Sequence, residues 1–231
     1  MKKVLLSVCL LALLLPAKAQ DNRGEVYNHY RPNGLSIEAT ASTGIFDIFA
    51  VELHQKPYLL TVGPTLYYRF NKNISLGLGT EFQASRGSRL DYNFDEYLMG
   101  IPVFASFKVN MGGQKTSPFF AARVGMIFDL NSIVEEQTYF YEGSYYDRPW
   151  GMYNYDKYRY GGIYTDLGFG LSVKRSNISL GIICSDLHFN RYHEESHYLS
   201  NGEVETTSGS SENIEPNINF YVRYSYTIPV F

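Results

Sequence analysis

Apolar and polar residues alternate with a period of two along most of the chain from residue 35 onward. Successive side chains of a β-strand point to opposite faces, so this period predicts strands with one apolar and one polar face. The clearest segment is 161–174, where Ile163, Leu167 and Phe169 alternate with glycine or polar residues. The pattern predicts eight strands, at residues 35–43, 58–70, 74–84, 97–109, 119–130, 161–174, 178–189 and 217–231.

The connections between these strands are alternately long and short. The short ones are 71–73, 110–118 and 175–177, and the long ones are 44–57, 85–96, 131–160 and 190–216. Outer-membrane barrels have short periplasmic turns and longer extracellular loops. The sequence therefore predicts an all-β fold, an eight-stranded antiparallel up-and-down transmembrane β-barrel over residues 34–231, with a periplasmic N-terminal segment at 20–33.

The first 19 residues have the layout of a secretory signal peptide. Lys2 and Lys3 precede an apolar run at 4–15, and Ala17 and Ala19 form a small-x-small cleavage site. An apolar run of this length is too short for a membrane-spanning helix, which takes about 20 residues. No later apolar segment approaches that length, so a membrane-embedded mature chain must cross as a closed sheet.

Composition fits this interpretation. The chain has 21 Tyr, 15 Phe and 20 Gly but a single Trp, an excess typical of strands, turns and membrane-interface girdles. The formal net charge of −3 gives no electrostatic footprint for nucleic acid, so no nucleic-acid partner is expected. Removal of the signal peptide would leave Cys184 as the only cysteine, which excludes an intrachain disulfide.

Strand alternation, loop asymmetry, the motif Asp166-Leu167-Gly168-Phe169-Gly170 and the final Phe231 together resemble OmpA/OmpX-like outer-membrane barrels. The chain is also similar to the porin-like barrel-domain proteins of Bacteroidetes. The resemblance implies a Gram-negative outer membrane, contact with outer-membrane lipid, and insertion by the barrel-assembly machinery, which reads a terminal aromatic residue. Phe231 is out of phase with the preceding apolar positions, and a bulge at Pro229 would restore the phase.

The main alternative is a secreted lipocalin-like binder, whose strands also alternate but turn their apolar face inward. A cluster of charges on one face of the predicted strands favours the membrane barrel, because it suits a polar lumen. An eight-stranded barrel is just wide enough for side chains to fill. We therefore expect a plugging charge network of Glu38, Glu81, Arg123, Asp166 and Arg223, in which Arg223 could meet Glu38. A narrow channel for ions or small solutes is the alternative.

One segment matches a metal-binding motif by letter. His193-Glu194-Glu195-Ser196-His197 reads H-E-x-x-H, which on a helix places two imidazoles on one face to hold zinc. It lies in a predicted polar loop without a clear third ligand, so we expect no metal and no cofactor. Some outer-membrane barrels modify lipids, and His188 and Ser196 could join the motif in such a site. Nothing in a loop holds a nucleophile within about 3 Å of its base, so no enzyme is expected.

The predicted loop at 131–160 is unusually aromatic. Aromatic side chains give large contact areas at low entropy cost. They could form a ligand-contacting lip for a glycan, a protein or lipid headgroups, or they could extend the fifth and sixth strands above the membrane. The residues of this extracellular aromatic loop are Tyr139, Tyr141, Tyr145, Tyr146, Trp150, Tyr153 and Tyr155. The sequence thus favours a structural, adhesive or recognition role carried by extracellular loops.

Overall fold

The computed structural model describes residues 34–45, 58–71, 73–86, 88–89, 92–93, 97–111, 116–141, 150–198 and 203–230. Every regular element within these ranges is a β-strand. None of the described residues forms a helix with the length and apolarity that a membrane span requires. The predicted signal peptide, the segment at 20–33 and Phe231 lie outside the described residues.

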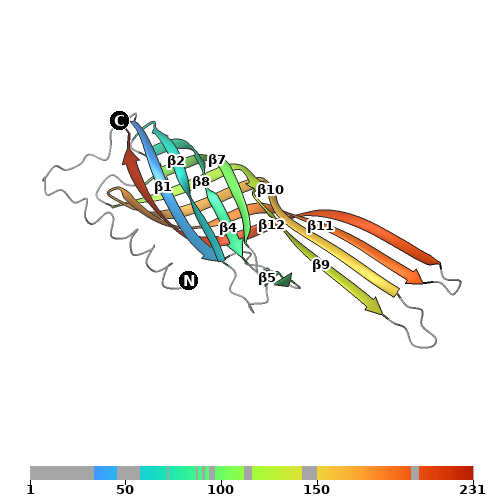
Figure 1. The fold of residues 1–231 in the computed structure, drawn as a ribbon. Helices are drawn as coiled ribbons and strands as arrows, with labels where there is room; N and C mark the ends of the chain where they lie inside the picture. The colour runs from blue at the N-terminus through green and yellow to red at the C-terminus, as the bar shows by residue number, and fades with distance from the viewer. Residues whose placement is uncertain are drawn as a thin grey trace.

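The strands pair antiparallel and close into a barrel with eight strand positions, as the sequence predicts. β1 pairs with β2 on one side and with β12 on the other, which closes the ring β1-β12-β11-β10-β8-β7-β3-β2 (Figure 1). The strands are β1 (Gly34–Ile45), β2 (Tyr58–Arg69), β3 (Ile74–Thr80), β4 (Phe82–Arg86), β5 (Ser88–Arg89), β6 (Tyr92–Asn93), β7 (Leu98–Asn110), β8 (Thr116–Asp129), β9 (Ser132–Tyr141), β10 (Trp150–Val173), β11 (Ser176–Tyr198) and β12 (Val204–Pro229).

The predicted third strand is one ribbon interrupted at Glu81, which gives β3 and β4. Thr80 lies opposite Pro64 of β2 in the continued register, and Glu81 donates its N–H to the carbonyl of Pro102 at 3.1 Å. A proline has no N–H to give to a β-ladder. Two prolines flanking one point of the ribbon therefore interrupt the regular pairing there, while both halves keep their place in the wall.

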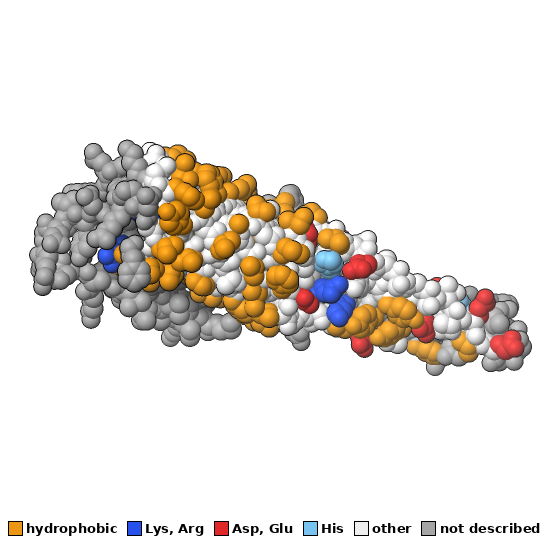
Figure 2. All heavy atoms as spheres, turned by 90° about the horizontal axis from the view of Figure 1, so that it is seen from above, with side chains coloured by type: hydrophobic (Ala, Val, Ile, Leu, Met, Phe, Trp, Pro, Cys, Tyr) orange, Lys and Arg blue, Asp and Glu red, His pale blue; other side chains and the backbone are white. Residues whose placement is uncertain are grey.

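The barrel is apolar outside and polar inside. Along β1, Ser36, Glu38, Thr40 and Ser42 are buried, whereas the alternate residues are exposed. Large apolar side chains cover the outer wall; Leu78, for example, is 70% exposed. Figure 2 shows these side chains spread over the barrel, while most of the visible charged side chains lie where the arm begins and along it. This is the opposite polarity to that of a lipocalin-like barrel, whose apolar face turns inward.

Two of the predicted long loops are largely strand instead. Residues 131–160 and 190–216 mostly belong to β9, β10, β11 and β12, so their prediction as loops is wrong. β9 continues the line of β8 along β10, and β10 and β11 stay paired as far as Trp150 and His197. The four strands leave the barrel as a long single-layer sheet, which we call the arm (Figure 1).

The arm has two faces, which follow from the alternation in the barrel. Its inner face continues the barrel interior and carries Asp156 and Tyr158 of β10. Its outer face continues the barrel exterior and carries the alternate residues, including Tyr155 and Lys157. Both faces leave large apolar side chains exposed: Tyr139 on the inner face is 48% exposed and Phe140 on the outer face 60%. Because both faces meet water, the arm lacks the apolar–polar alternation that reveals the barrel strands.

Side chains fix the junction between barrel and arm. The pairing of β10 with β11 shifts between Tyr160 and Tyr164, which marks a bulge. Gly162 within it has a φ of 89°, and Asp186 Oδ2 accepts the N–H of Ile163 at 2.8 Å. The Asp186 carboxylate therefore satisfies a backbone donor that the bulge removes from the ladder.

Asn131 has a similar role where β8 becomes β9. Its Oδ1 accepts the N–H of Met99 at 2.7 Å, and its Nδ2 donates to the carbonyl of Tyr97 at 2.7 Å. The amide thus substitutes for a strand partner at the end of β7. Beyond this point β9 follows β10 and leaves the barrel wall.

We predict that Asp186→Ala weakens the junction, because the N–H of Ile163 loses its acceptor at a cost of about 1 kcal/mol. Gly162→Val should cost more, since φ is positive and a Cβ at Gly162 would lie 2.5 Å from Asp186 Oδ2. Hydrogen exchange of β10 near Ile163 measures the effect. Asp186→Asn, which keeps an oxygen acceptor, is the control, and unchanged exchange in Asp186→Ala would contradict the role of this side chain.

Candidate functional site

The barrel lumen contains an alternating cluster of two carboxylates and two guanidinium groups. Arg123 of β8 forms an ion pair with Glu81 and lies 3.5 Å from Asp166 Oδ2 of β10. Arg223 of β12 lies 2.5 Å from the same Asp166 oxygen and 3.5 Å from Glu81 Oε2. All four side chains are almost completely buried. Each charge contacts two charges of opposite sign, which offsets the cost of taking it out of water.

One neutral hydroxyl group also donates to each of these carboxylates. Thr40 Oγ1 donates to Glu81 Oε1 at 2.8 Å, and the Tyr221 hydroxyl donates to Asp166 Oδ1 at 2.6 Å. The guanidinium carbon of Arg223 lies 4.2 Å from the centroid of the Tyr221 ring. The cluster thus occupies the lumen with most of its polar groups partnered, although the Nε atoms of Arg123 and Arg223 have no hydrogen-bond partner among the described residues.

A second ion pair lies at the end of the lumen where the short turns are found. Lys108 Nζ lies 2.6 Å from Glu38 Oε2 and 4.4 Å from the centroid of the Phe119 ring. Ser225 and Asn177 also donate to the Glu38 carboxylate, at 2.9 and 3.2 Å. Each of the two clusters is electrically balanced.

The structure places all five charged residues predicted for the lumen inside the barrel: Glu38, Glu81, Arg123, Asp166 and Arg223. All of them except Glu38 meet in the alternating cluster. The predicted contact between Arg223 and Glu38 is wrong. On β1, Arg223 lies opposite Ser42, whereas Glu38 lies opposite Thr227 and binds Lys108 instead. Sequence reasoning missed Lys108, although its phase in the fourth predicted strand already places it on the inward face.

A cluster of buried apolar side chains lies in the lumen at the end where the arm begins. Tyr160 anchors it, because its hydroxyl lies 2.6 Å from Ser85 Oγ. Tyr158 stacks on Phe189 at 4.9 Å between ring centroids. The other buried members at this end are Leu59, Leu98, Ile127, Ile133 and Leu187. We call this group the apolar cap. Together with the two ion clusters, it places side chains inside the lumen at several levels.

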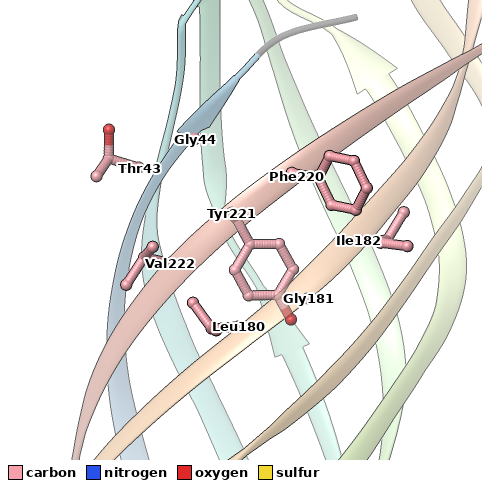
Figure 3. Close-up of a pocket in the computed structure, with 8 residues that line it drawn as sticks. All are labelled: Thr43, Gly44, Leu180, Gly181, Ile182, Phe220, Tyr221 and Val222. Atoms are coloured by element: carbon pink, nitrogen blue, oxygen red, sulfur yellow. The ribbon is translucent and has the colours of Figure 1, made fainter. Parts of the chain in front are cut away.

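An open groove of about 490 Å³ lies on the outer wall, where β1, β12 and β11 run side by side (Figure 3). Its lining is mostly apolar: Thr43, Gly44, Leu180, Gly181, Ile182, Phe220, Tyr221 and Val222. Gly44 and Gly181 belong to the inward phase of their strands, and a Cβ at Gly181 would lie 2.4 Å from the Tyr221 hydroxyl in the lumen, so they line the groove only with backbone. The groove contains no acid, base or nucleophile set, so it offers no catalytic chemistry.

The H-E-x-x-H segment lies on β11, paired on both sides, and is neither a loop nor a helix. In a strand, residues four apart are separated by about 13 Å, too far for His193 and His197 to share one zinc ion. His193 Nδ1 instead lies 2.7 Å from Asn154 Oδ1, and His197 Nε2 lies 3.0 Å from Glu195 Oε1. The described residues contain no group of three or more His, Cys, Asp or Glu side chains placed to hold a metal.

The histidine and serine residues considered for a lipid-modifying catalytic site do not lie close together in the structure. Ser196 and His193 lie on opposite faces of the arm, and the Ser196 hydroxyl contacts Thr206 at 3.2 Å. His188 shares the face of Ser196, but it lies eight positions away along the strand, a distance of about 26 Å. A nucleophile and its base need to lie about 3 Å apart, so this group has no catalytic geometry.

The aromatic segment is part of the arm rather than a loop. Tyr139 and Tyr141 belong to β9, and Trp150, Tyr153 and Tyr155 belong to β10. Residues 145 and 146 lie outside the described residues. Of the two predicted arrangements, the extension of the fifth and sixth strands is the one that the structure shows for the described residues, because β9 and β10 remain paired along the arm.

No family model and no curated protein matches the sequence. Solved structures similar to the fold include the N-terminal β-barrel domain of Pseudomonas aeruginosa OprF (11% identity, TM-score 0.35, 85% of this chain and 98% of that one). Pseudomonas aeruginosa OprG (14%, 0.39, 85% and 97%) and the Escherichia coli outer membrane protease OmpT (9%, 0.29, 87% and 98%) are also similar. Since these identities and TM-scores are low, nothing about the activity of those proteins transfers to this chain.

We predict that Arg123→Met destabilises the barrel by about 3–5 kcal/mol, because Glu81 and Asp166 remain buried with too few positive partners. Urea unfolding in lipid vesicles, followed by the gel mobility of unboiled samples, measures the loss. The double variant Lys108→Met with Glu38→Gln is the matched control, because it removes a whole ion pair and preserves charge balance. Equal losses in both variants would show that charge balance does not govern stability.

Proposed function

We propose that this protein is a non-enzymatic barrel of a Gram-negative outer membrane with a closed lumen, and that its arm recognises a partner outside the cell. The observation that carries the proposal is the continuation of the barrel wall as a four-stranded sheet beyond the apolar band. Strands that served only to span a bilayer would need about 9 to 11 residues. β10, β11 and β12 have 24, 23 and 26.

The polarity of the surface supports the membrane location. Ile163 of β10 is 61% exposed at the upper edge of the apolar wall. Lys157 and Arg159 of β10 and His188 of β11 share the outer face on the arm side of Ile163, as expected for residues that would meet headgroups at the edge of a bilayer around the apolar wall. Tyr68 and Phe70 are exposed near the opposite end, like the aromatic girdles of membrane barrels.

The closed lumen supports a role other than conduction. The apolar cap and the ion clusters occupy successive levels of the lumen. We expect the purified protein to give no single-channel steps in planar bilayers at physiological salt. Regular steps in the wild type that Arg123→Met abolishes or alters would favour the narrow channel instead.

The arm supports recognition because a single-layer sheet has no core of its own. Large exposed apolar surface on a folded protein commonly marks a contact site, and tyrosine and tryptophan suit both glycan and protein ligands. Short turns lie at the opposite end from the arm. With the orientation usual for such barrels, the arm is then outside the cell, which also fits insertion by the barrel-assembly machinery from the periplasm.

A shortened-arm variant tests this proposal. Residues 135–156 and 191–211 are each replaced by Asn-Gly, a dipeptide suited to tight hairpins. The cut ends are register partners, since Val134 lies opposite Lys157 and Asn190 opposite Glu212. We expect cells carrying the full chain, but not the variant, to bind members of a panel of immobilised glycans and proteins.

Two controls make the outcome interpretable. A retained heat-dependent gel shift in the variant shows that the barrel still forms. In a Cys184→Ser background, Ser208→Cys on the arm should react with a membrane-impermeant maleimide on intact cells, whereas Thr116→Cys at the turn end should not. Equal panel binding by both forms, or labelling only at position 116, would overturn the proposal.

A further inference from the structure

Three tyrosines and two glutamates come together on the outer face of the arm. The strand register places them in two adjacent rows. One row runs Glu136 of β9, Tyr155 of β10 and Tyr192 of β11, and the next places Tyr153 of β10 opposite Glu194 of β11. We call these five residues the Tyr–Glu patch.

Within the patch, Tyr192 contacts both Tyr153 and Glu194. The Tyr153 and Tyr192 rings are 6.3 Å apart between centroids and inclined at 61°. The Tyr192 hydroxyl donates to Glu194 Oε2 at 2.7 Å. The three tyrosines and Glu194 are half-buried, and Glu136 is exposed. The patch therefore presents ring faces and carboxylates together to solvent.

None of the ion pairs that the described bases of the arm form involves the carboxylates of the patch. In the described part of the arm, Lys157, Arg159 and Arg191 are the only lysines and arginines, and all lie on the barrel side of the patch. Arg191 binds Asp156 on the inner face, at 2.9 Å, and Arg159 contacts Glu212 at 3.6 Å.

The tyrosine hydroxyls respond to this field. Desolvation, and after it the negative charge of Glu136 and of Glu194, raises the pKa of the Tyr153 hydroxyl. The hydrogen bond to Glu194 raises the pKa of Tyr192. A ligand that brings positive charge to these rings would relieve the excess negative potential.

We propose that the Tyr–Glu patch binds an extended basic segment of a partner polypeptide, whose lysine or arginine side chains lie on the tyrosine rings and pair with the two carboxylates. This inference rests on the proposed recognition role of the arm and names the chemistry of its partner. Cations are attracted to the faces of aromatic rings, and the complementary charges of Glu136 and Glu194 set the orientation and the partner choice.

The shape of the patch favours a polypeptide over a small cation. Small quaternary ammonium groups are held in aromatic cages that surround them, whereas these tyrosines stand side by side on one face of a flat sheet. Neighbouring strands are about 4.8 Å apart, so the patch offers a row of sites across β9, β10 and β11. A neutral glycan would use the rings but would leave the negative charge without a role.

The test uses the full-length protein in detergent micelles and a fluorescent ten-residue peptide of alternating lysine and serine, read by anisotropy. Glu136→Gln with Glu194→Gln should weaken binding about fivefold, and Tyr153→Leu with Tyr192→Leu by a similar factor. The matched control is Glu195→Gln with Glu205→Gln, which removes two charges on the inner face. It should leave affinity unchanged, and a retained gel shift verifies folding in each variant.

The outcomes separate this inference from the proposed function. Binding that falls with added salt, and that only the outer-face variants weaken, supports the patch. The inference would be overturned if the outer-face and inner-face variants had equal effects. It would also be overturned if the arm bound the same peptide with glutamate in place of lysine, or bound a neutral oligosaccharide in place of the lysine peptide. If the lysine peptide does not bind but the shortened-arm variant still loses panel binding, the inference fails and the recognition role stands.

Discussion

Two carboxylates and two guanidinium groups alternate inside the barrel, so each charge lies against charges of opposite sign. Glycines in the surrounding strands leave space for this arrangement. The Tyr221 hydroxyl binds Asp166, and a Cβ at Gly168 or Gly181 would lie within 2.5 Å of that hydroxyl. Several of the chain's many glycines therefore serve the lumen rather than turns, because bulky aromatic and charged side chains need bare backbone opposite them.

The barrel strands could be predicted because their two faces meet different surroundings. Ile163 faces outward and Asp166 inward, and this contrast repeats along each strand. The arm could not be predicted in the same way, because both of its faces meet water. Tyr155 and Asp156 are then neighbours in a sequence that reads as a polar loop. Only the continued pairing between strands distant in sequence holds such a segment extended.

The contacts within the lumen were only partly predictable for a related reason. The inward phase of Glu38 and Arg223 follows from alternation alone, but their partners depend on how far each strand is staggered around the ring. The stagger of a closed barrel is a property of all its strands together. The sequence pattern therefore identifies which charges enter the lumen, whereas the three-dimensional register decides that Glu38 meets Lys108.

The unbroken course of β10 from the barrel into the arm has a consequence for how such a protein changes over evolutionary time. Tyr153 and Ile163 are ten residues apart on one strand, a contour length of about 33 Å. Adding two residues to each arm strand would raise the tip by about 7 Å and keep every side chain on its original face, whereas adding one would exchange the two faces. The height of the tip above the bilayer can thus be adjusted in paired steps without disturbing the barrel below.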